Sequence, residues 1–122
     1  MKTIKHQADF CVIGGGLAGM CAAIQAARHG IKTILMHERP VLGGNASSEI
    51  RMWICGATGW VETGLVEEIR LENLHRNNYP NYSVWDSILY EKVKFQDNLT
   101  CLLNCSCQDA VMDGSKIGRA HV

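Results

Sequence analysis

The chain has 122 residues, so the sequence predicts at most one domain. Its 47% apolar content is typical of a globular protein, and its 12 basic and 12 acidic residues cancel, which gives no electrostatic argument for nucleic acid or an anionic membrane as a partner. Because the sequence has no run of about 18 apolar residues and no apolar stretch before the strand near residue 9, it predicts neither a membrane span nor a signal peptide.

The first predicted elements are a strand, a glycine-rich turn and a helix. An apolar strand at about 9–13 runs into Gly14-x-Gly16-x-x-Gly19, and a helix of small residues follows at about 17–29. Gly14 permits the tight turn, Gly16 lets a pyrophosphate approach the backbone, and Gly19 lets the helix pack close to the strands. The free N–H groups at the start of the helix would face the phosphates. The alternative is an ordinary α/β turn that binds no ligand.

A second apolar strand is predicted at about 32–37 and ends at an acidic residue. Glu38 follows Gly19 by 19 residues, which is the spacing of the acid that binds ribose hydroxyls in dinucleotide-binding βαβ units. Its carboxylate would repel a 2′-phosphate, which favours FAD or NAD over NADP. The alternative is a solvated charge at the end of the strand.

Residues 39–62 are predicted to form a long loop, and its length indicates a functional role. The loop contains the doublet Gly43-Gly44 followed by short side chains, and two glycines allow a ligand to approach the backbone closely. The doublet after the acid resembles the glutathione-reductase-like FAD-binding fold. It resembles more closely the FAD-dependent oxidoreductases that include fumarate-reductase-like flavoproteins. The resemblance covers residues 9 to about 56. The alternative for the doublet is a flexible turn.

The resemblance implies an α/β, Rossmann-like FAD/NAD(P)-binding fold with a parallel sheet, truncated at the start of an antiparallel meander. It also implies FAD as cofactor, a small-molecule substrate, and an oxidoreductase of which this chain binds the ADP half of FAD. No catalytic residue is assigned, because the substrate-facing residues of the family come from later segments. The alternatives are the Rossmann domain of an NAD-dependent dehydrogenase and a non-catalytic nucleotide-binding fragment. The implied cofactor-binding residues are Gly14, Gly15, Gly16, Leu17, Ala18, Gly19, Glu38, Arg39, Gly43, Gly44, Asn45, Ala46 and Ser47.

The remaining elements continue the α/β pattern. Helices are predicted at about 63–76 and 84–96, and residues 99–104 form a third parallel strand, in the order 3-2-1. Residues 107–112 are predicted to be a further strand, and 113–116 carry a hairpin turn signal. In the family that the chain resembles, this hairpin would begin an antiparallel meander.

The last six residues are interpreted as a separate segment. Residues 1–116 are predicted to be the N-terminal part of a FAD-binding Rossmann-like domain, and 117–122 a non-native tail. The tail can be encoded by ATC GGA AGA GCA CAC GTC, the start of a common sequencing adapter. The return strand of the meander is accordingly expected to be missing. The alternative is a natural tail, and genomic DNA that continues from Lys116 into the same six codons and a stop would support it.

Cysteine and histidine residues do not form a recognisable metal motif. The six cysteines include no Cys-x-x-Cys pair, and the histidines, His37 among them, lack metal-like spacing, so no metal is predicted. The thiols are expected to be reduced, as in a cytoplasmic protein. Cys55 is the exception, because its place after the glycine doublet makes it a candidate redox thiol.

Overall fold

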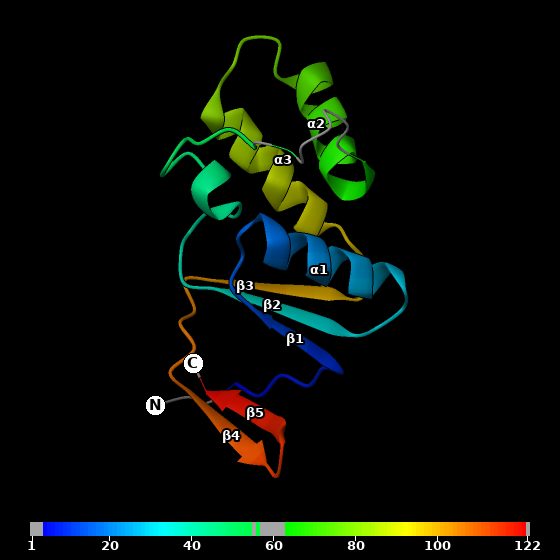
Figure 1. The fold of residues 1–122 in the computed structure, drawn as a ribbon, viewed down its shortest axis with the longest axis vertical. Coiled ribbons are helices and arrows are strands. Elements are labelled where there is room, and N and C mark those ends of the chain that lie inside the picture. The colour runs from blue at the N-terminus through cyan, green and yellow to red at the C-terminus, as the bar shows by residue number, and fades with distance from the viewer. Residues whose placement is uncertain (1–3, 55, 57–62, 122) are drawn as a thin grey trace.

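Figure 1 shows a sheet of three parallel strands between a group of helices and a two-stranded hairpin. The structure is a computed structural model that describes residues 4–54, 56 and 63–121. Its alternation of strands and helices is that of a Rossmann-like α/β fold, as the sequence predicts. In the described part of the chain, no helix combines the length and the apolar character needed to cross a membrane.

The sheet consists of β1 (Phe10–Ile13), β2 (Thr33–His37) and β3 (Leu99–Leu103). Strand β2 lies in the centre, and both of its pairings are parallel. These findings confirm the three predicted strands and their order. All five residues of β2 are buried, as expected of a central strand in a parallel sheet. Strand β3 ends one residue earlier than predicted, because Asn104 takes a positive φ of 55°.

Helix α1 (Leu17–Arg28) packs against β1 and β2. Its buried residues recur at three- and four-residue intervals, which is the period of one helical face. They are Met20, Ala23, Ile24 and Ala27. The helix stops at His29, because Gly30 turns the chain away with a φ of 81°. The opposite end of α1 lies at the carboxyl ends of the strands, where β1 leads into the helix (Figure 1).

Helices α2 (Gly64–Arg76) and α3 (Tyr82–Lys94) complete the helical layer. Helix α3 packs against β3 and α1, and α2 packs against α3. Helix α3 begins and ends two residues earlier than predicted. Its early start follows from Asn81, whose side chain accepts the Ser83 N–H at 2.8 Å and caps the helix. The buried core therefore lies between the sheet and the helices. Its residues are Met20, Ala23, Ile24, Leu35, Leu42, Ile69, Ile88, Leu89 and Val93.

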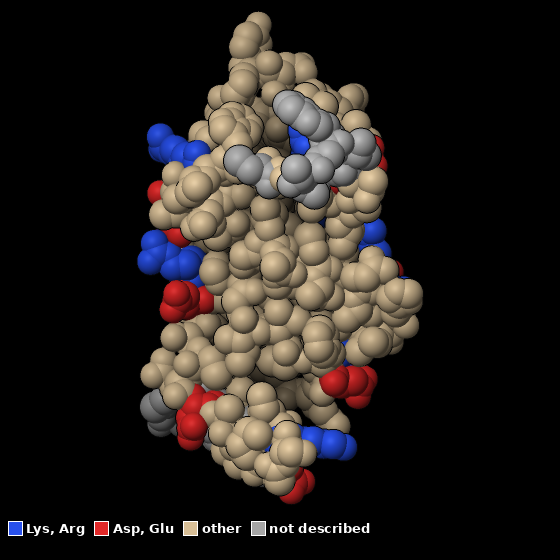
Figure 2. Space-filling view, viewed as in Figure 1, with Lys and Arg blue, Asp and Glu red and all other residues tan. Residues whose placement is uncertain are grey.

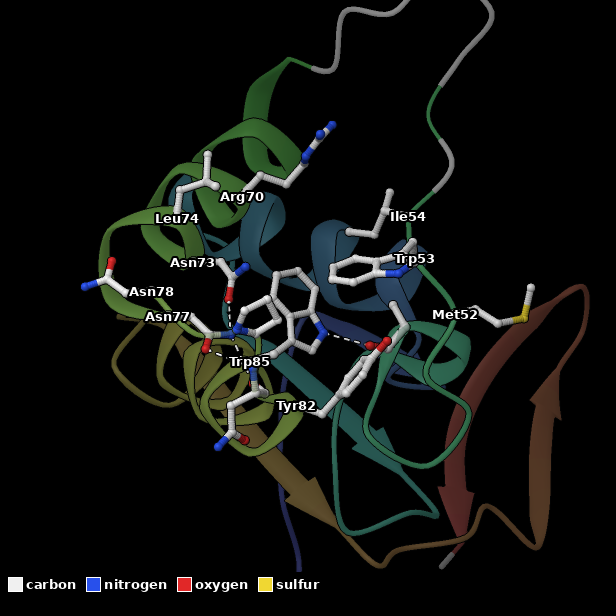
Figure 3. A pocket seen from close by; sticks show the side chains of 13 residues that line it. Met52, Trp53, Ile54, Arg70, Asn73, Leu74, Asn77, Asn78, Tyr82 and Trp85 are labelled. Carbon is white, nitrogen blue, oxygen red and sulfur yellow. Dashed lines mark hydrogen bonds between the residues drawn. The ribbon is translucent and has the colours of Figure 1, made fainter.

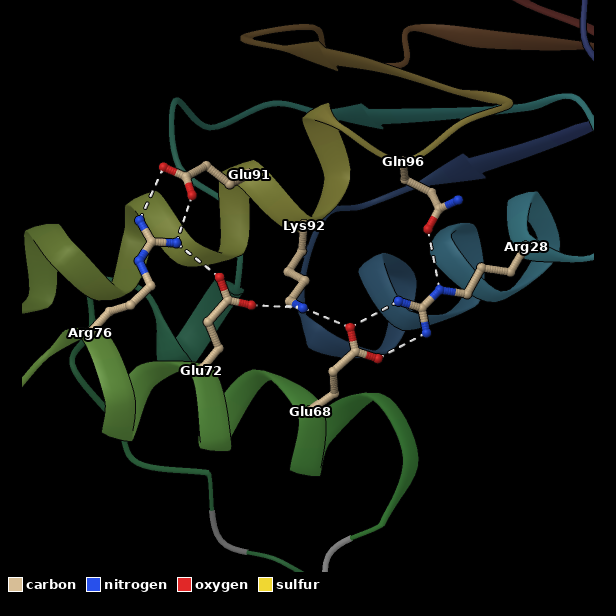
Figure 4. A network of polar contacts seen from close by, with 7 residues as sticks. All are labelled: Arg28, Glu68, Glu72, Arg76, Glu91, Lys92 and Gln96. Carbon is tan, nitrogen blue, oxygen red and sulfur yellow. Dashed lines mark hydrogen bonds and ion pairs between the residues drawn. The ribbon is translucent and has the colours of Figure 1, made fainter.

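A network of charged side chains joins α2 to α1 and α3 (Figure 4). Glu68 lies between Arg28 of α1, at 2.9 Å, and Lys92 of α3, at 2.6 Å. The hydrogen bond from Arg28, followed by that from Lys92, lowers the pKa of Glu68 to about 2. Arg76 makes a second link to α3 through Glu91. The network links α2 to its neighbours in addition to the apolar contacts of Ile69, which is fully buried, and Leu65, which packs against the core.

The hairpin consists of β4 (Asp109–Asp113) and β5 (Lys116–His121), which pair antiparallel. The expectation that the return strand is missing is wrong, because β5 occupies that position. It includes most of the segment interpreted as a non-native tail. Alternating backbone groups of these residues can pair with β4 whatever their origin, so the origin of 117–122 stays a prediction.

Candidate functional site

The turn between β1 and α1 is held at the carboxyl ends of the strands. The Gly14 N–H donates to the carbonyl of Met36 at 2.8 Å, and Gly14 has a φ of 107°, which favours glycine. Gly16 is the N-cap residue of α1, with extended backbone and no side-chain cap. The first N–H groups of the helix therefore lack partners within the helix and can donate hydrogen bonds to an anion.

Two glycines of the turn have opposite surroundings. A Cβ on Gly19 would overlap the carbonyl oxygen of Gly14, because the two atoms would be much closer than 3.0 Å, the shortest distance that Cβ atoms normally show. It would also lie 3.3 Å from Val12 Cγ1. Gly19 therefore allows the helix to pack directly on the first strand, as expected. A Cβ on Gly16 would meet no atom within 4 Å. The space beside the Gly16 backbone is open, as the approach of a ligand requires.

The glycine doublet lies directly against this turn. The Gly43 N–H donates to the Gly15 carbonyl at 2.8 Å, and Gly43 forms a bridge with Gly16. A Cβ on Gly44 would lie 3.2 Å from the Gly16 Cα. Both glycines of the doublet have positive φ values, 105° and 58°. The structure thus brings together two glycine-rich segments that are separated by 27 positions in the sequence, Gly16 and Gly43 being their bridging residues.

The two charged residues after β2 differ in their contacts. The Arg39 guanidinium donates two hydrogen bonds to Glu49, each 3.0 Å long. These hydrogen bonds raise the pKa of Arg39 above its usual value. Glu38 is exposed, and among the described residues it makes no side-chain hydrogen bond or ion pair. Its carboxylate is therefore free to accept hydrogen bonds from a ligand, whereas Arg39 is engaged in holding the loop.

The residues after the doublet are mostly turned inward. Asn45 is exposed, but Ala46 is 6% exposed and Ser47 is fully buried. The Ala46 carbonyl accepts a hydrogen bond from Trp85 Nε1 at 2.7 Å. The Asp86 carboxylate accepts the N–H of the residue after Ser47 at 3.0 Å. Helix α3 therefore holds this loop through Trp85 and Asp86, and the buried Ser47 contributes to packing.

Sequence reasoning missed one residue of the site. The sequence indicates no role for His37 beyond its lack of metal-like spacing, but its side chain is 9% exposed, and its Nδ1 accepts the Gly15 N–H at 3.0 Å. Its Nε2 is buried and has no partner among the described residues. No signal in a single sequence points to this contact, because the two residues lie on different elements 22 positions apart.

A cavity of about 580 Å³ lies beside the loop, between the segment near Trp53 and the helices α2 and α3 (Figure 3). Trp85 and Tyr82 of α3 line it, and Arg70 and Asn73 face it from α2. The Trp53 and Tyr82 rings lie 6.0 Å apart between centroids. A volume of this size is in the range of small-molecule sites.

Three cysteines of the described chain have thiols that ionise less readily than a free thiol. Cys11, Cys21 and Cys101 are free, and burial raises the pKa of each thiol, which lowers its thiolate fraction. Cys55, the candidate redox thiol, lies outside the described residues. Within residues 4–54, 56 and 63–121, no three His, Cys, Asp or Glu side chains are grouped to hold a metal ion.

The parallel sheet, the glycine turn at a helix N-terminus and the acid after the second strand define a Rossmann-like dinucleotide-binding domain. The family model described as FAD dependent oxidoreductase matches residues 9–122. The chain belongs to this family, and its cofactor is FAD. The resemblance seen in the sequence is thereby confirmed.

Similar proteins agree with this assignment. The chain is 56% identical over 36 residues to mitochondrial dihydrolipoyl dehydrogenase of Schizosaccharomyces pombe, and 53% identical over 38 residues to fumarate reductase (cytochrome) of Shewanella frigidimarina. These matches cover 30% and 31% of this chain, which spans 7% of the length of either relative. This chain also resembles the crystal structure of Thermovibrio ammonificans THI4, with a TM-score of 0.55; the match covers 93% of this chain and 45% of the THI4 chain. At 18% identity, that likeness shows the fold.

Proposed function

We propose that this chain is the FAD-binding segment of a flavin-dependent oxidoreductase and that it holds the ADP half of the cofactor. The observation that carries the proposal is the open space at Gly16, where a Cβ would meet no atom within 4 Å. That space lies at the N-terminus of α1 and is bordered by Gly44, whose own Cβ would crowd the Gly16 Cα. A negatively charged group is stabilised there by the helix dipole and by free backbone N–H groups.

The residues of the site divide into three roles in this proposal. The backbone N–H groups of Gly16 and of the first turn of α1 bind the pyrophosphate. Gly44 leaves room for the cofactor beside the turn, because its Cβ would lie 3.2 Å from the Gly16 Cα. Gly43 keeps the doublet packed on α3, because a Cβ there would lie 2.6 Å from Leu89 Cδ1. Glu38 accepts the ribose hydroxyls. Bound FAD supplies electron transfer, and the chain supplies position and electrostatics.

The substrate and the cellular compartment are further parts of the proposal. We propose a small-molecule substrate, which the cavity of about 580 Å³ beside the loop is large enough to hold. On the face shown in Figure 2, Lys and Arg lie at the margins and are interspersed with Asp and Glu, which supports a partner other than nucleic acid. The reduced cysteines of the described chain support a cytoplasmic location.

Titration of the chain with FAD, followed by flavin fluorescence, tests the proposal. Gly16→Ala adds one methyl group to the open space and should weaken FAD binding at least tenfold, because the methyl group occupies the path of the pyrophosphate. Gly118→Ala is the matched control: it adds the same group in β5, at an ordinary 3.5 Å from the Val111 carbonyl, and should leave binding unchanged. Equal FAD affinity of Gly16→Ala and the wild type would reject the site, and binding of NAD in place of FAD would favour a dehydrogenase.

A further inference from the structure

His37 stands at the end of the central strand, directly behind the glycine turn. Side chains along a strand alternate between its two faces, so His37 shares a face with Leu35. Leu35 belongs to the core between the sheet and the helices. The imidazole is therefore placed on the helical side of the sheet, where the turn into α1 begins. There its Nδ1 accepts the Gly15 N–H at 3.0 Å.

This hydrogen bond determines which nitrogen of the ring carries the proton. An acceptor Nδ1 must be unprotonated, so the neutral ring carries its hydrogen on Nε2. That Nε2 is buried and has no partner among the described residues. An apolar residue in the same place would avoid burying an unpaired N–H. Burying the imidazole therefore costs free energy that an apolar side chain would not, which indicates that its Nδ1 acceptor has a role.

Two hydrogen bonds, from different partners, hold the two peptide groups that flank Gly15. Its N–H is held by His37, and its carbonyl accepts the Gly43 N–H at 2.8 Å. In a trans peptide the N–H of Gly16 points opposite to that carbonyl. The direction of the Gly16 N–H is therefore set, and no described residue accepts it. The fit is close, because a Cβ on Gly15 would lie 2.8 Å from His37 Cγ and 2.6 Å from Leu42 Cδ2.

We propose that His37 is a positioning residue for the cofactor pyrophosphate. It acts through Gly15: His37 holds the N–H of this residue while the Gly43 N–H holds its carbonyl, and together they orient the turn so that the Gly16 N–H points into the open space before the ligand arrives. This inference rests on the proposed function of the site. A turn ordered in advance binds more tightly, because ordering it costs no free energy at the moment of binding.

Two substitutions separate the acceptor from the volume of the ring. In His37→Asn the Oδ1 atom is bonded to Cγ, as Nδ1 is in histidine, so an acceptor remains near the same place. His37→Leu has nearly the shape of asparagine and no acceptor. Both remove part of the ring and should lower the melting temperature similarly. FAD affinity should fall about tenfold in His37→Leu and stay within threefold of the wild type in His37→Asn. Equal affinity of the two variants would overturn the proposal.

A measurement without FAD keeps this inference distinct from the proposed function. In the wild type, NMR should show His37 as the Nε2–H tautomer, with scalar coupling between Nδ1 and the Gly15 amide nitrogen across the hydrogen bond. Absence of that coupling, or the other tautomer, would refute the positioning role even if His37→Leu fails to fold. A wild-type chain that shows the coupling but binds no FAD would reject the proposed function while leaving the contact in place.

Discussion

Replacing Gly19 by alanine tests how closely α1 is packed on the sheet. The new Cβ would overlap the Gly14 carbonyl oxygen and come within 3.3 Å of Val12 Cγ1. Both neighbours belong to the first strand and its turn. Because the overlapping atom is a backbone oxygen, the new methyl group cannot be accommodated by the rotation of a flexible side chain. The start of the helix must move away by roughly 1 Å to restore ordinary van der Waals contact.

The expected cost follows from that displacement. Overpacking of a close-packed interior costs typically 1–3 kcal/mol, and a rigid backbone neighbour places this site near 3 kcal/mol. A chain of 122 residues has a free energy of unfolding of roughly 6–18 kcal/mol, so Gly19→Ala should fold but melt at a temperature about 10 °C lower. Urea unfolding followed by circular dichroism measures the change.

Gly16→Ala is the control for this prediction. The added methyl group meets no atom within 4 Å and the backbone φ is −63°, so its free energy of unfolding should stay within about 0.5 kcal/mol of the wild type. The two variants should therefore show opposite patterns, one losing stability and the other losing FAD. If Gly19→Ala is as stable as the wild type, then α1 does not pack on the strand as described and the reasoning fails.

Two further predictions concern the helical layer. The pKa of Glu68 is lowered from 4.5 to about 2, so its contribution to stability is present above pH 4.5 and is lost as the pH falls toward 2. Because Glu68 is 37% exposed, Glu68→Gln should lower the free energy of unfolding by only about 1 kcal/mol at pH 7. Urea titrations should show this difference from the wild type shrinking as the pH falls. A difference that stays constant down to pH 2 would contradict the pairing of Glu68 with Arg28 and Lys92. Trp85→Phe leaves the Ala46 carbonyl without its 2.7 Å donor and should cost about 1–3 kcal/mol. FAD affinity should fall as well, since the loop loosens, and an unchanged affinity in fluorescence titration would separate this loop from the site.

The sequence by itself determined the elements whose signals are local. The apolar strands, the small-residue helix and the glycines of the turn follow each other within about 30 residues, and each follows from a short-range rule of backbone or packing. For that reason the three strands, their order, the turn at Gly14 and the close packing at Gly19 are confirmed. The FAD-dependent family also followed from this segment, because the doublet comes after the acid at a characteristic place.

Only the tertiary structure decided which distant residues meet at the turn. His37 contacts Gly15 across 22 positions, and Trp85 contacts Ala46 across 39. No periodicity or turn signal in the sequence predicts such contacts, because they depend on how the helical layer packs on the sheet. The pairing of β5 with β4 was missed for a related reason. Antiparallel pairing uses backbone N–H and C=O groups, and every residue except proline carries both. The composition of the last six residues therefore does not indicate whether they pair.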